Sequence, residues 1–326
     1  MKKSYCAVIR TLGTAGDKYL KELQSLQAQS LQPEKTLVYI AEGYPLPKEN
    51  NGQEEYIRCS KGMVKQRSLP FKEVDTEWML LLDDDMYLPP NMVETMIEKA
   101  IQEEADCIVP DVYALHKKNA LDRFLYFLYN SVSSFNNDTW AQVVKNDGSF
   151  SFNRNPGKSF LPTQTGAGAC VLVRKKAYQQ IHFEDEQWLD KFKFASQDDQ
   201  LFLFKLYLYG FKVLMYFDSG IVHLDARAGE RPDVSKKMFY KKMNNYVVWY
   251  RSVYETRKND AERIEAQKAF RRRNFWNFFA MLVDALRYRK INYILDYFRG
   301  IRAGKNYVRS KEYKSIPVYY TFYARS

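Results

Sequence analysis

The chain has 326 residues, of which 46% are apolar, so it can bury the core of one large domain or of two smaller ones. Its four cysteines form no CxxC pair, which argues against a zinc knuckle or a disulfide framework. The net charge is +11, but residues 241–326 alone hold 20 Lys and Arg against 7 Asp and Glu. This asymmetry indicates a polyanionic partner for the C-terminal region, either nucleic acid or an anionic membrane surface.

Strands and helices are predicted to alternate from the N-terminus. Apolar runs bounded by turn residues predict strands over residues 5–13, 35–43, 78–85 and 105–113. Helical spacing predicts helices over residues 17–31 and 89–104, and part of residues 61–74. This alternation favours an α/β fold with a mainly parallel sheet covered by helices.

Membrane-spanning and secreted classes are not expected. The chain has no run of about 18 uncharged apolar residues, which a single spanning helix requires. The opening MKKSYCAVIRTLG lacks the apolar run of roughly 7–15 residues that marks a signal peptide. We therefore expect a cytoplasmic setting with reduced thiols.

Three consecutive aspartates, Asp83, Asp84 and Asp85, end the apolar run WMLLL. Neighbouring carboxylates repel one another and resist burial unless a cation or a donor compensates them. In open parallel sheets, ligands bind outside the carboxyl ends of the strands. Carboxylates in this position suit a hard divalent cation that shares its ligands with substrate phosphates. The alternative is a solvated acidic loop, or a cap for the following helix.

These segments together resemble family 2 glycosyltransferases, which are nucleotide-sugar-dependent enzymes of the GT-A fold. The resemblance rests on the order of strand, SLQAQSLQP, strand, KGMVKQRS and LLLDDDMYLPP, and it extends over about residues 4–254. It implies a GT-A catalytic domain over residues 1–225, followed by a lid loop and helix over residues 226–270. A basic, aromatic helical extension over residues 271–326 completes the expected organisation.

The resemblance also implies the donor site. The DDD run matches the metal-binding DxD motif of the family, so Asp83 and Asp84 are expected beside the nucleotide, with Asp83 near the ribose. Asp85 is expected to hold Mg2+ or Mn2+ on the diphosphate of a nucleoside-diphosphate sugar, with Asp83 as a further ligand. Thr11 matches the end of the first strand, beside the nucleotide, although a simple helix cap is the alternative. Glu42 falls where the family often has an aspartate near the base.

Arg67 matches the arginine that the family places shortly before the DxD strand, near the nucleotide. The alternative is an ordinary exposed helix arginine. Gly166 and Gly168 match the small residues that let donor and acceptor approach the backbone, or they form a bulge in a strand. His223 ends a predicted strand and matches the histidine that can complete the metal shell, although a lone histidine is usually structural.

Transfer of a sugar to a hydroxyl requires a base for the hydroxyl proton. The segment FASQDDQLFLFKLYLYGFKV matches the acidic motif of the family, and a register without gaps makes Asp199 the base and puts Asp198 on the usual glutamate. The other register makes Asp198 the base and requires an insertion of one residue. Both carboxylates can also simply cap the helix that follows.

The C-terminal extension carries two apolar helix faces flanked by basic residues. The first consists of Phe275, Phe278, Phe279, Leu282, Ala285 and Leu286, and the second of Ile291, Ile294, Leu295, Phe298 and Ile301. Such helices can lie in anionic headgroups, or they can pack on the catalytic domain. Nucleic acid is not expected, because no RNA- or DNA-binding signature accompanies the charge. An apolar helix over residues 120–135 and a long loop over residues 136–158 form an expected acceptor-side insertion.

The resemblance implies an inverting transferase that moves a sugar, with UDP as the expected nucleotide, to a glycan or lipid-linked acceptor. Synthesis of cell-surface polysaccharide, with the enzyme peripheral on the inner face of the membrane, is the expected role. Two alternatives remain open: a metal-dependent nucleotidyltransferase, and a catalytically inactive relative that serves as a membrane scaffold. The first lacks a Gly-rich phosphate loop, and the second is suggested only by Asp198 in place of glutamate.

Overall fold

The computed structural model describes residues 3–112, 134–135, 138–153, 156–192, 196–224, 234–287 and 292–319. The predicted lid loop falls on residues 225–233, outside this part of the chain. The predicted helix over residues 120–135 also lies outside it, apart from the last two residues, which form strand β7 (Ser134–Phe135). No helix among the described residues is long and apolar enough to cross a membrane.

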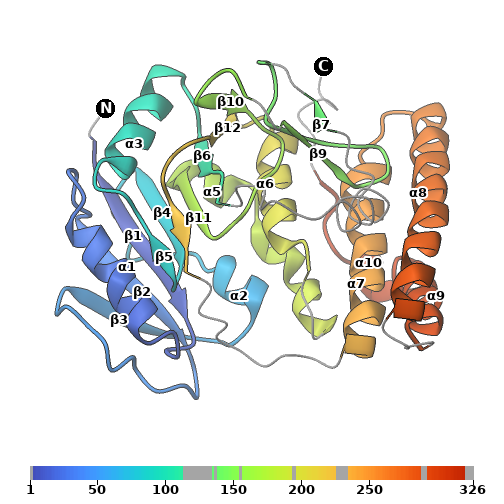
Figure 1. The fold of residues 1–326 in the computed structure, drawn as a ribbon, viewed down its shortest axis with the longest axis horizontal. Coiled ribbons are helices and arrows are strands. Elements are labelled where there is room, and N and C mark those ends of the chain that lie inside the picture. Colours follow the sequence, from blue (N-terminus) through green and yellow to red (C-terminus); the bar gives the residue numbers. More distant parts are fainter. Residues whose placement is uncertain are drawn as a thin grey trace.

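An eight-stranded mixed sheet forms the centre of the described structure, in the order β10-β12-β6-β11-β4-β1-β2-β3 (Figure 1). Strands β4, β1, β2 and β3 run parallel to one another, and β6 runs parallel to β12. Strands β10 and β11 run antiparallel to their neighbours. The strands are β1 (Tyr5–Thr11), β2 (Lys35–Ala41), β3 (Glu54–Cys59), β4 (Trp78–Asp83), β6 (Cys107–Pro110), β10 (Phe160–Pro162), β11 (Cys170–Arg174) and β12 (Val213–Tyr216). The predicted α/β fold with a mainly parallel sheet is confirmed.

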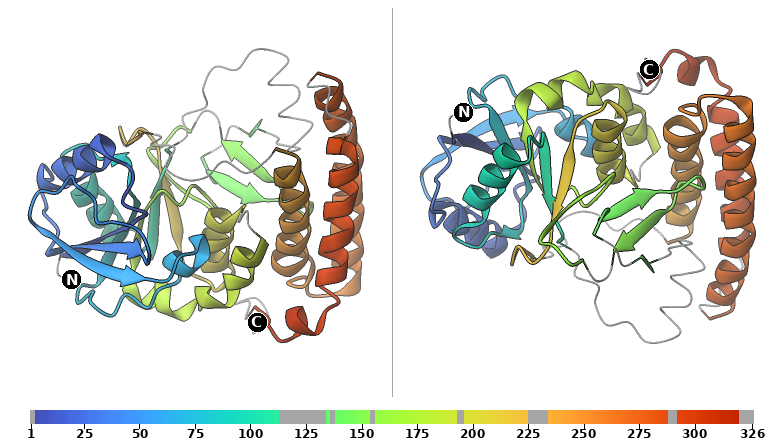
Figure 2. Two further views of the ribbon diagram at one scale, coloured as in Figure 1. Left: turned by 90° about the horizontal axis from the view of Figure 1, so that it is seen from below. Right: turned by 90° about the horizontal axis from the view of Figure 1, so that it is seen from above.

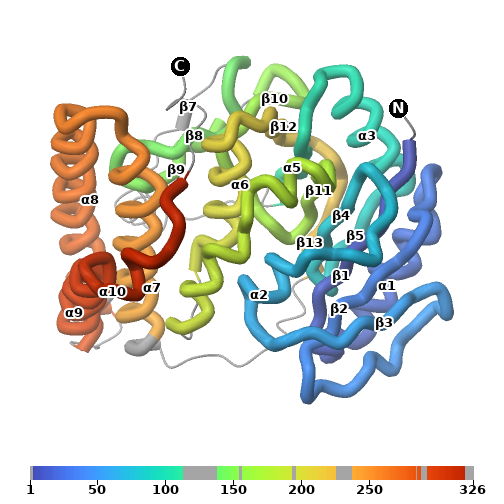
Figure 3. The backbone as a smooth tube through the Cα atoms, turned by 180° about the vertical axis from the view of Figure 1, so that it is seen from behind, coloured from blue at the N-terminus to red at the C-terminus, as the bar shows by residue number. Residues whose placement is uncertain are grey.

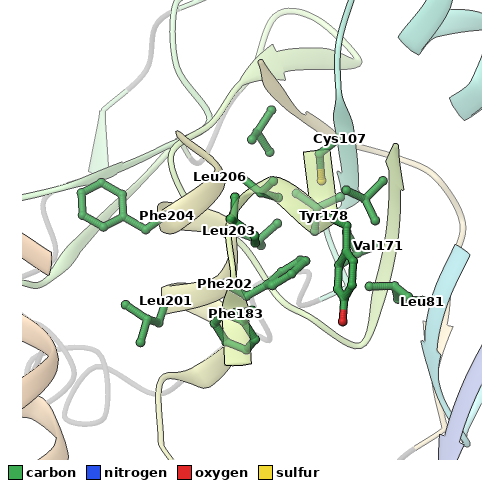
Figure 4. Close-up of a cluster of buried hydrophobic side chains, with 14 of the residues drawn as sticks. Leu81, Cys107, Val171, Tyr178, Phe183, Leu201, Phe202, Leu203, Phe204 and Leu206 are labelled. Carbon is green, nitrogen blue, oxygen red and sulfur yellow. The ribbon is translucent and has the colours of Figure 1, made fainter. Parts of the chain in front are cut away.

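Both faces of this sheet are buried, which explains why its strands are continuous apolar runs. Alternate residues of β1 point to opposite faces: Tyr5, Ala7 and Ile9 pack with helices α1 (Asp17–Gln27) and α3 (Met92–Gln102). Cys6 and Val8 belong to a larger cluster on the other face. Figure 4 shows part of that cluster, in which side chains of α5 (Lys175–Gln180) and α6 (Asp198–Leu208) pack with side chains of β4, β6 and β11.

The second face is covered by α5 (Lys175–Gln180), the 3-10 segment η1 (Phe183–Phe192) and α6 (Asp198–Leu208). Two smaller sheets join the main one. One pairs β5 (Met86–Tyr87) with β13 (Val222–His223). In the other, β9 (Phe150–Asn153) lies between β7 and β8 (Gln142–Val144). A short helix, α2 (Met63–Arg67), packs on η1.

Helices of the C-terminal region form an outer layer, with α7 between α6 and α8 in the views of Figures 1 and 3. They are α7 (Val234–Trp249) with its continuation η2 (Tyr250–Tyr254), α8 (Asp260–Arg287), α9 (Asn292–Tyr307) and α10 (Lys311–Lys314). Gly300 and Gly304 let α9 approach α7 closely, because a Cβ on Gly300 would lie 2.4 Å from the carbonyl oxygen of Phe239. The predicted boundary between residues 270 and 271 falls inside α8.

Candidate active site

The carboxyl ends of β1 and β4 lie side by side, and their parallel register aligns Arg10 with Asp83. Arg10 is buried, and its guanidinium Nη2 lies 2.6 Å from Asp83 Oδ1 and 3.3 Å from the carbonyl oxygen of Gly168. Burial lowers the pKa of Arg10, and the nearby Arg67 charge adds to that effect. The sequence analysis did not identify Arg10, although the aspartates require a compensating cation.

The middle aspartate is held by the last residue of β1. Thr11 Oγ1 donates to Asp84 Oδ2 at 2.5 Å and accepts from the backbone nitrogen of Gly13 at 2.7 Å. Burial raises the pKa of Asp84 to about 6, and the charges of Asp85 and Asp83 act in the same direction. Thr11 therefore fixes the aspartate loop through the bond from its hydroxyl to Asp84.

Arg67 is the last residue of α2. Asp190 fixes the start of this helix, because its carboxylate accepts from the backbone nitrogens of Val64 at 3.0 Å and Lys65 at 2.8 Å. The alternative of an exposed helix arginine is wrong, because Arg67 is only 4% exposed. Its short helix ends against the core, since Tyr178 donates to the carbonyl oxygen of Arg67 at 2.8 Å.

The Arg67 guanidinium joins three elements of the predicted site. Nη2 lies 2.7 Å from Asp199 Oδ1, Nε lies 3.1 Å from Asp198 Oδ2, and Nη1 donates to the carbonyl oxygen of Gly168 at 3.0 Å. Burial by itself lowers the pKa of Arg67, but the charges of Asp199 and Asp198 outweigh it and raise that pKa above its usual value.

Asp198 and Asp199 occupy the first turn of α6, where the helix dipole favours negative charge. Gln197, the residue before them, adopts a left-handed conformation with φ of 74°, which turns the chain sharply into the helix. Asp198 is buried, whereas the Asp199 side chain is 27% exposed. Burial and the Asp199 charge raise the pKa of Asp198, against the opposing charge of Arg67. Of the two carboxylates, Asp199 is the one that a solute can reach.

The two glycines differ in their surroundings. A Cβ on Gly168 would lie 2.2 Å from Arg67 Nη1 and 2.8 Å from Asp199 Oδ1, so glycine is required there by the ion pairs. A Cβ on Gly166 would instead meet Val109 and Leu203, which belong to the apolar core. Gly168 is thus part of the charged cluster, whereas Gly166 lies against the apolar core. Both precede β11 rather than lying within the strand.

His223 reaches the aspartates through the pairing of β13 with β5, which aligns His223 with Met86. Its Nε2 lies 3.2 Å from Asp85 Oδ1, and the backbone nitrogen of Leu224 donates to the carbonyl oxygen of Asp85 at 2.8 Å. Among the described residues no group of three or more His, Cys, Asp or Glu side chains is placed to hold a metal ion. An imidazole and a carboxylate nevertheless fit Mg2+ or Mn2+, because such a cation takes its remaining ligands from phosphate and water.

Two further carboxylates lie at different depths. Glu42 is exposed in the turn after β2, away from the charged cluster. Glu22 of α1 is fully buried beneath the aspartate loop, and its Oε2 accepts from the backbone nitrogen of Met86 at 3.1 Å. Burial raises the pKa of Glu22 well above its usual value. Glu22 was not predicted from the sequence, because only the apolar positions of α1 show the helical spacing.

An open α/β sheet with charged side chains at its carboxyl ends is the arrangement of a ligand-binding α/β enzyme. The profile of the family "Glycosyl transferase family 2" matches residues 35–181, a range that includes Arg67, the three aspartates and both glycines. Residues 35–181 therefore form a family 2 glycosyltransferase domain, which confirms the resemblance predicted from the motifs. Its sheet is mixed and mostly parallel and is flanked by helices.

Comparison with curated proteins gives no match. Among solved structures, the chain is similar to the crystal structure of GalNAc-T7 with UDP, GalNAc and Mn2+, at 12% identity and a TM-score of 0.45. The similarity covers 83% of this chain and 55% of that one.

Proposed function

We propose that the protein transfers a sugar, with inversion, from a nucleoside-diphosphate sugar to a hydroxyl group of a glycan or lipid-linked acceptor. The observation that carries the proposal is the convergence of Arg10, Arg67, Asp83 and Asp199 around the carbonyl of Gly168. This cluster combines fixed positive charge with two partly exposed carboxylates, those of Asp83 and Asp199, at the sheet edge where ligands of such folds bind. The family match supports the donor class.

In this proposal the donor lies across the ends of β1 and β4. Asp83, Asp84 and Thr11 line the nucleotide side, with Glu42 toward the base. Asp85 and His223 would hold Mg2+ or Mn2+, which supplies positive charge to stabilise the departing diphosphate, and Asp83 is a further candidate ligand. UDP is the proposed nucleotide.

Asp199 is the proposed general base. The acceptor oxygen attacks the anomeric carbon and its proton passes to the Asp199 carboxylate, while the bond from that carbon to the diphosphate oxygen breaks on the opposite face. The ion pair with Arg67 orients the carboxylate, and its partial exposure lets an acceptor reach it. Asp198 is buried beside Nε of the same guanidinium, so its proposed role is to position Arg67.

We further propose that the acceptor belongs to cell-surface polysaccharide synthesis. A lipid-linked acceptor stays at a membrane, which places the enzyme peripherally on the cytoplasmic face. The near-neutral body and basic C-terminal region of the chain support this location.

A thermal-shift titration tests the donor site, because a ligand that binds only the folded state raises the melting temperature. UDP with Mg2+ or Mn2+ is expected to raise it, and chelation or Asp85→Ala is expected to remove most of that rise. Equal stabilisation by UDP with and without the cation would contradict the assignment of Asp85. Asp199→Asn tests the base separately: UDP still binds, while turnover falls.

A further inference from the structure

Helices α8 and α9 present an apolar ridge to the outside, at the edge of the molecule farthest from the sheet (Figure 2). Rings along it are in contact: centroids lie 5.1 Å apart for Phe275 and Phe279, 5.8 Å for Phe279 and Phe278, and 5.6 Å for Phe278 and Phe298. Its exposed members are Phe275, Trp276, Phe279, Val283, Leu286, Leu295 and Phe298. A contiguous exposed apolar surface of this kind marks an interaction site.

The ridge matches the faces expected from the sequence only in part. Ala285 of the first predicted face is buried, whereas Trp276 and Val283, which were not part of it, are exposed. The other exposed members were predicted: Phe275, Phe279, Leu286, Leu295 and Phe298. The inner side of the two helices is well packed, because Met281 and Tyr297 are fully buried and Tyr297 donates to Asn274 at 3.0 Å. In the described part of the chain, the two helices therefore pack on the fold with one side and leave the apolar side chains of the other side exposed.

Basic side chains border the ridge at both ends. Arg271 and Arg272 lie one turn before Phe275, and Arg287 ends α8, all exposed. On α9, Arg302 and Lys305 are exposed one and two turns beyond Phe298. In the sequence, residues 271–307 contain nine Lys and Arg against two Asp, which gives this stretch a net charge of +7.

We propose that this ridge, α8 and α9 together, docks the protein on an anionic lipid bilayer. Exposed aromatic and aliphatic side chains enter the boundary between headgroups and acyl chains, and the bordering cations contact the anionic headgroups. A second copy of the chain would bring the same positive charge to the same ridge and be repelled. Nucleic acid would satisfy the cations but would leave the aliphatic members Val283, Leu286 and Leu295 exposed to water. The inference does not depend on the proposed sugar transfer.

Flotation with vesicles tests the docking on the full chain, without any nucleotide. Vesicles containing about 30% phosphatidylglycerol are expected to carry the protein at low salt, and pure phosphatidylcholine vesicles much less. Each basic residue near such a surface strengthens binding by about fivefold, and salt screens that attraction. Failure to float with the anionic vesicles at low salt overturns the proposal, and capture by a single-stranded oligonucleotide instead would assign the surface to nucleic acid.

Variants separate charge from apolar contact. Arg271→Gln with Arg272→Gln is expected to weaken binding by roughly 10- to 30-fold, while Lys21→Gln with Lys72→Gln, exposed elsewhere, is expected to leave it unchanged. Arg273 is not included, because it is buried and donates to the carbonyl oxygen of Asp147 at 2.8 Å.

Apolar insertion is tested in two ways. Phe279→Ser is expected to weaken binding at fixed salt by roughly tenfold, and Leu46→Ser, which removes a side chain of similar exposure (48% against 43%), is expected to have no effect. Brominated lipid should quench the fluorescence of Trp276, which is 49% exposed, and Trp276→Phe should abolish that quenching. This second measurement uses no Phe279 variant, so it decides the question even if Phe279→Ser fails to fold. Quenching unaffected by Trp276→Phe would contradict insertion of the ridge.

Discussion

Replacing Gly168 with alanine is predicted to damage catalysis while leaving the fold largely in place. The added methyl carbon would lie 2.2 Å from Arg67 Nη1 and 2.8 Å from Asp199 Oδ1, whereas ordinary contacts begin near 3.4 Å. One or both groups must therefore move by about 1 Å. Arg67 cannot swing away freely, because it is buried and paired with Asp198 on its other side.

Both consequences have expected magnitudes. Overpacking of this kind typically costs about 1–3 kcal/mol of folding stability, which for a chain of 326 residues corresponds to a fall in melting temperature of roughly 1.5–4.5 °C. Misplacing a catalytic group by about 1 Å can cost on the order of 100-fold in rate. We therefore expect Gly168→Ala to lower kcat by about two orders of magnitude, measured as nucleoside diphosphate released from a donor sugar.

Gly166→Ala is the matched control. Its methyl carbon would meet only side-chain carbons, Val109 Cγ1 at 3.0 Å and Leu203 Cδ1 at 3.2 Å, which can shift by a few tenths of an ångström. Turnover is expected to stay within about threefold of the wild type, since the charged cluster is not touched. Wild-type turnover and stability in Gly168→Ala would refute the idea that the Arg67–Asp199 pair is fixed in its position.

Four further substitutions test separate parts of the account. Asp199→Asn is expected to lower turnover by about 10²–10⁴-fold with little change in UDP affinity, and a larger loss in Asp198→Asn would show that the alternative register is correct. Asp85→Ala should abolish the dependence of UDP binding on a divalent cation, as seen by calorimetry with and without chelator. Glu186→Gln should cost about 3–5 kcal/mol in urea unfolding, because it leaves Lys205 (3.0 Å) and Arg251 (2.9 Å) buried without their carboxylate. Burial alone would raise the pKa of Glu186, but these cations lower it below its ordinary value of 4.5. The contribution of the carboxylate to folding stability is therefore complete above pH 4.5 and is lost as the pH falls further.

The sequence was sufficient to predict those elements that have a clear hydrophobic pattern and clear turn residues at their ends. The predicted strands over residues 5–13, 35–43 and 78–85 correspond to β1, β2 and β4, and the alternation of strands and helices gave the fold class. Strand β3 was missed, because it is a polar edge strand whose side chains are mostly half-buried or exposed. The antiparallel direction of β10 and β11 also could not be predicted, since strand direction depends on the path of long connections.

At the site, the acidic motifs were identified from the sequence and His223 from the family resemblance, but Arg10 was not. The aspartate run and the Asp198–Asp199 pair are visible as carboxylates after an apolar strand and before an apolar helix. Arg10 was overlooked because it sits inside an apolar strand, and its role appears only when the register of β1 and β4 aligns it with Asp83. The burial of Arg67 was equally hidden, because a five-residue helix has no pattern that reveals its inner face.

Product analysis tests the central claim most directly. The protein is incubated with UDP-sugars and Mn2+ or Mg2+, and the phosphorus-containing products are identified with and without Asp199→Asn. The account predicts that wild-type protein releases UDP, by slow transfer to water where no acceptor is present, and that Asp199→Asn greatly reduces this release. Release of inorganic diphosphate would identify a nucleotidyltransferase, and metal-dependent UDP binding with no turnover on any donor or acceptor would identify an inactive relative. Either result would contradict the proposed sugar transfer.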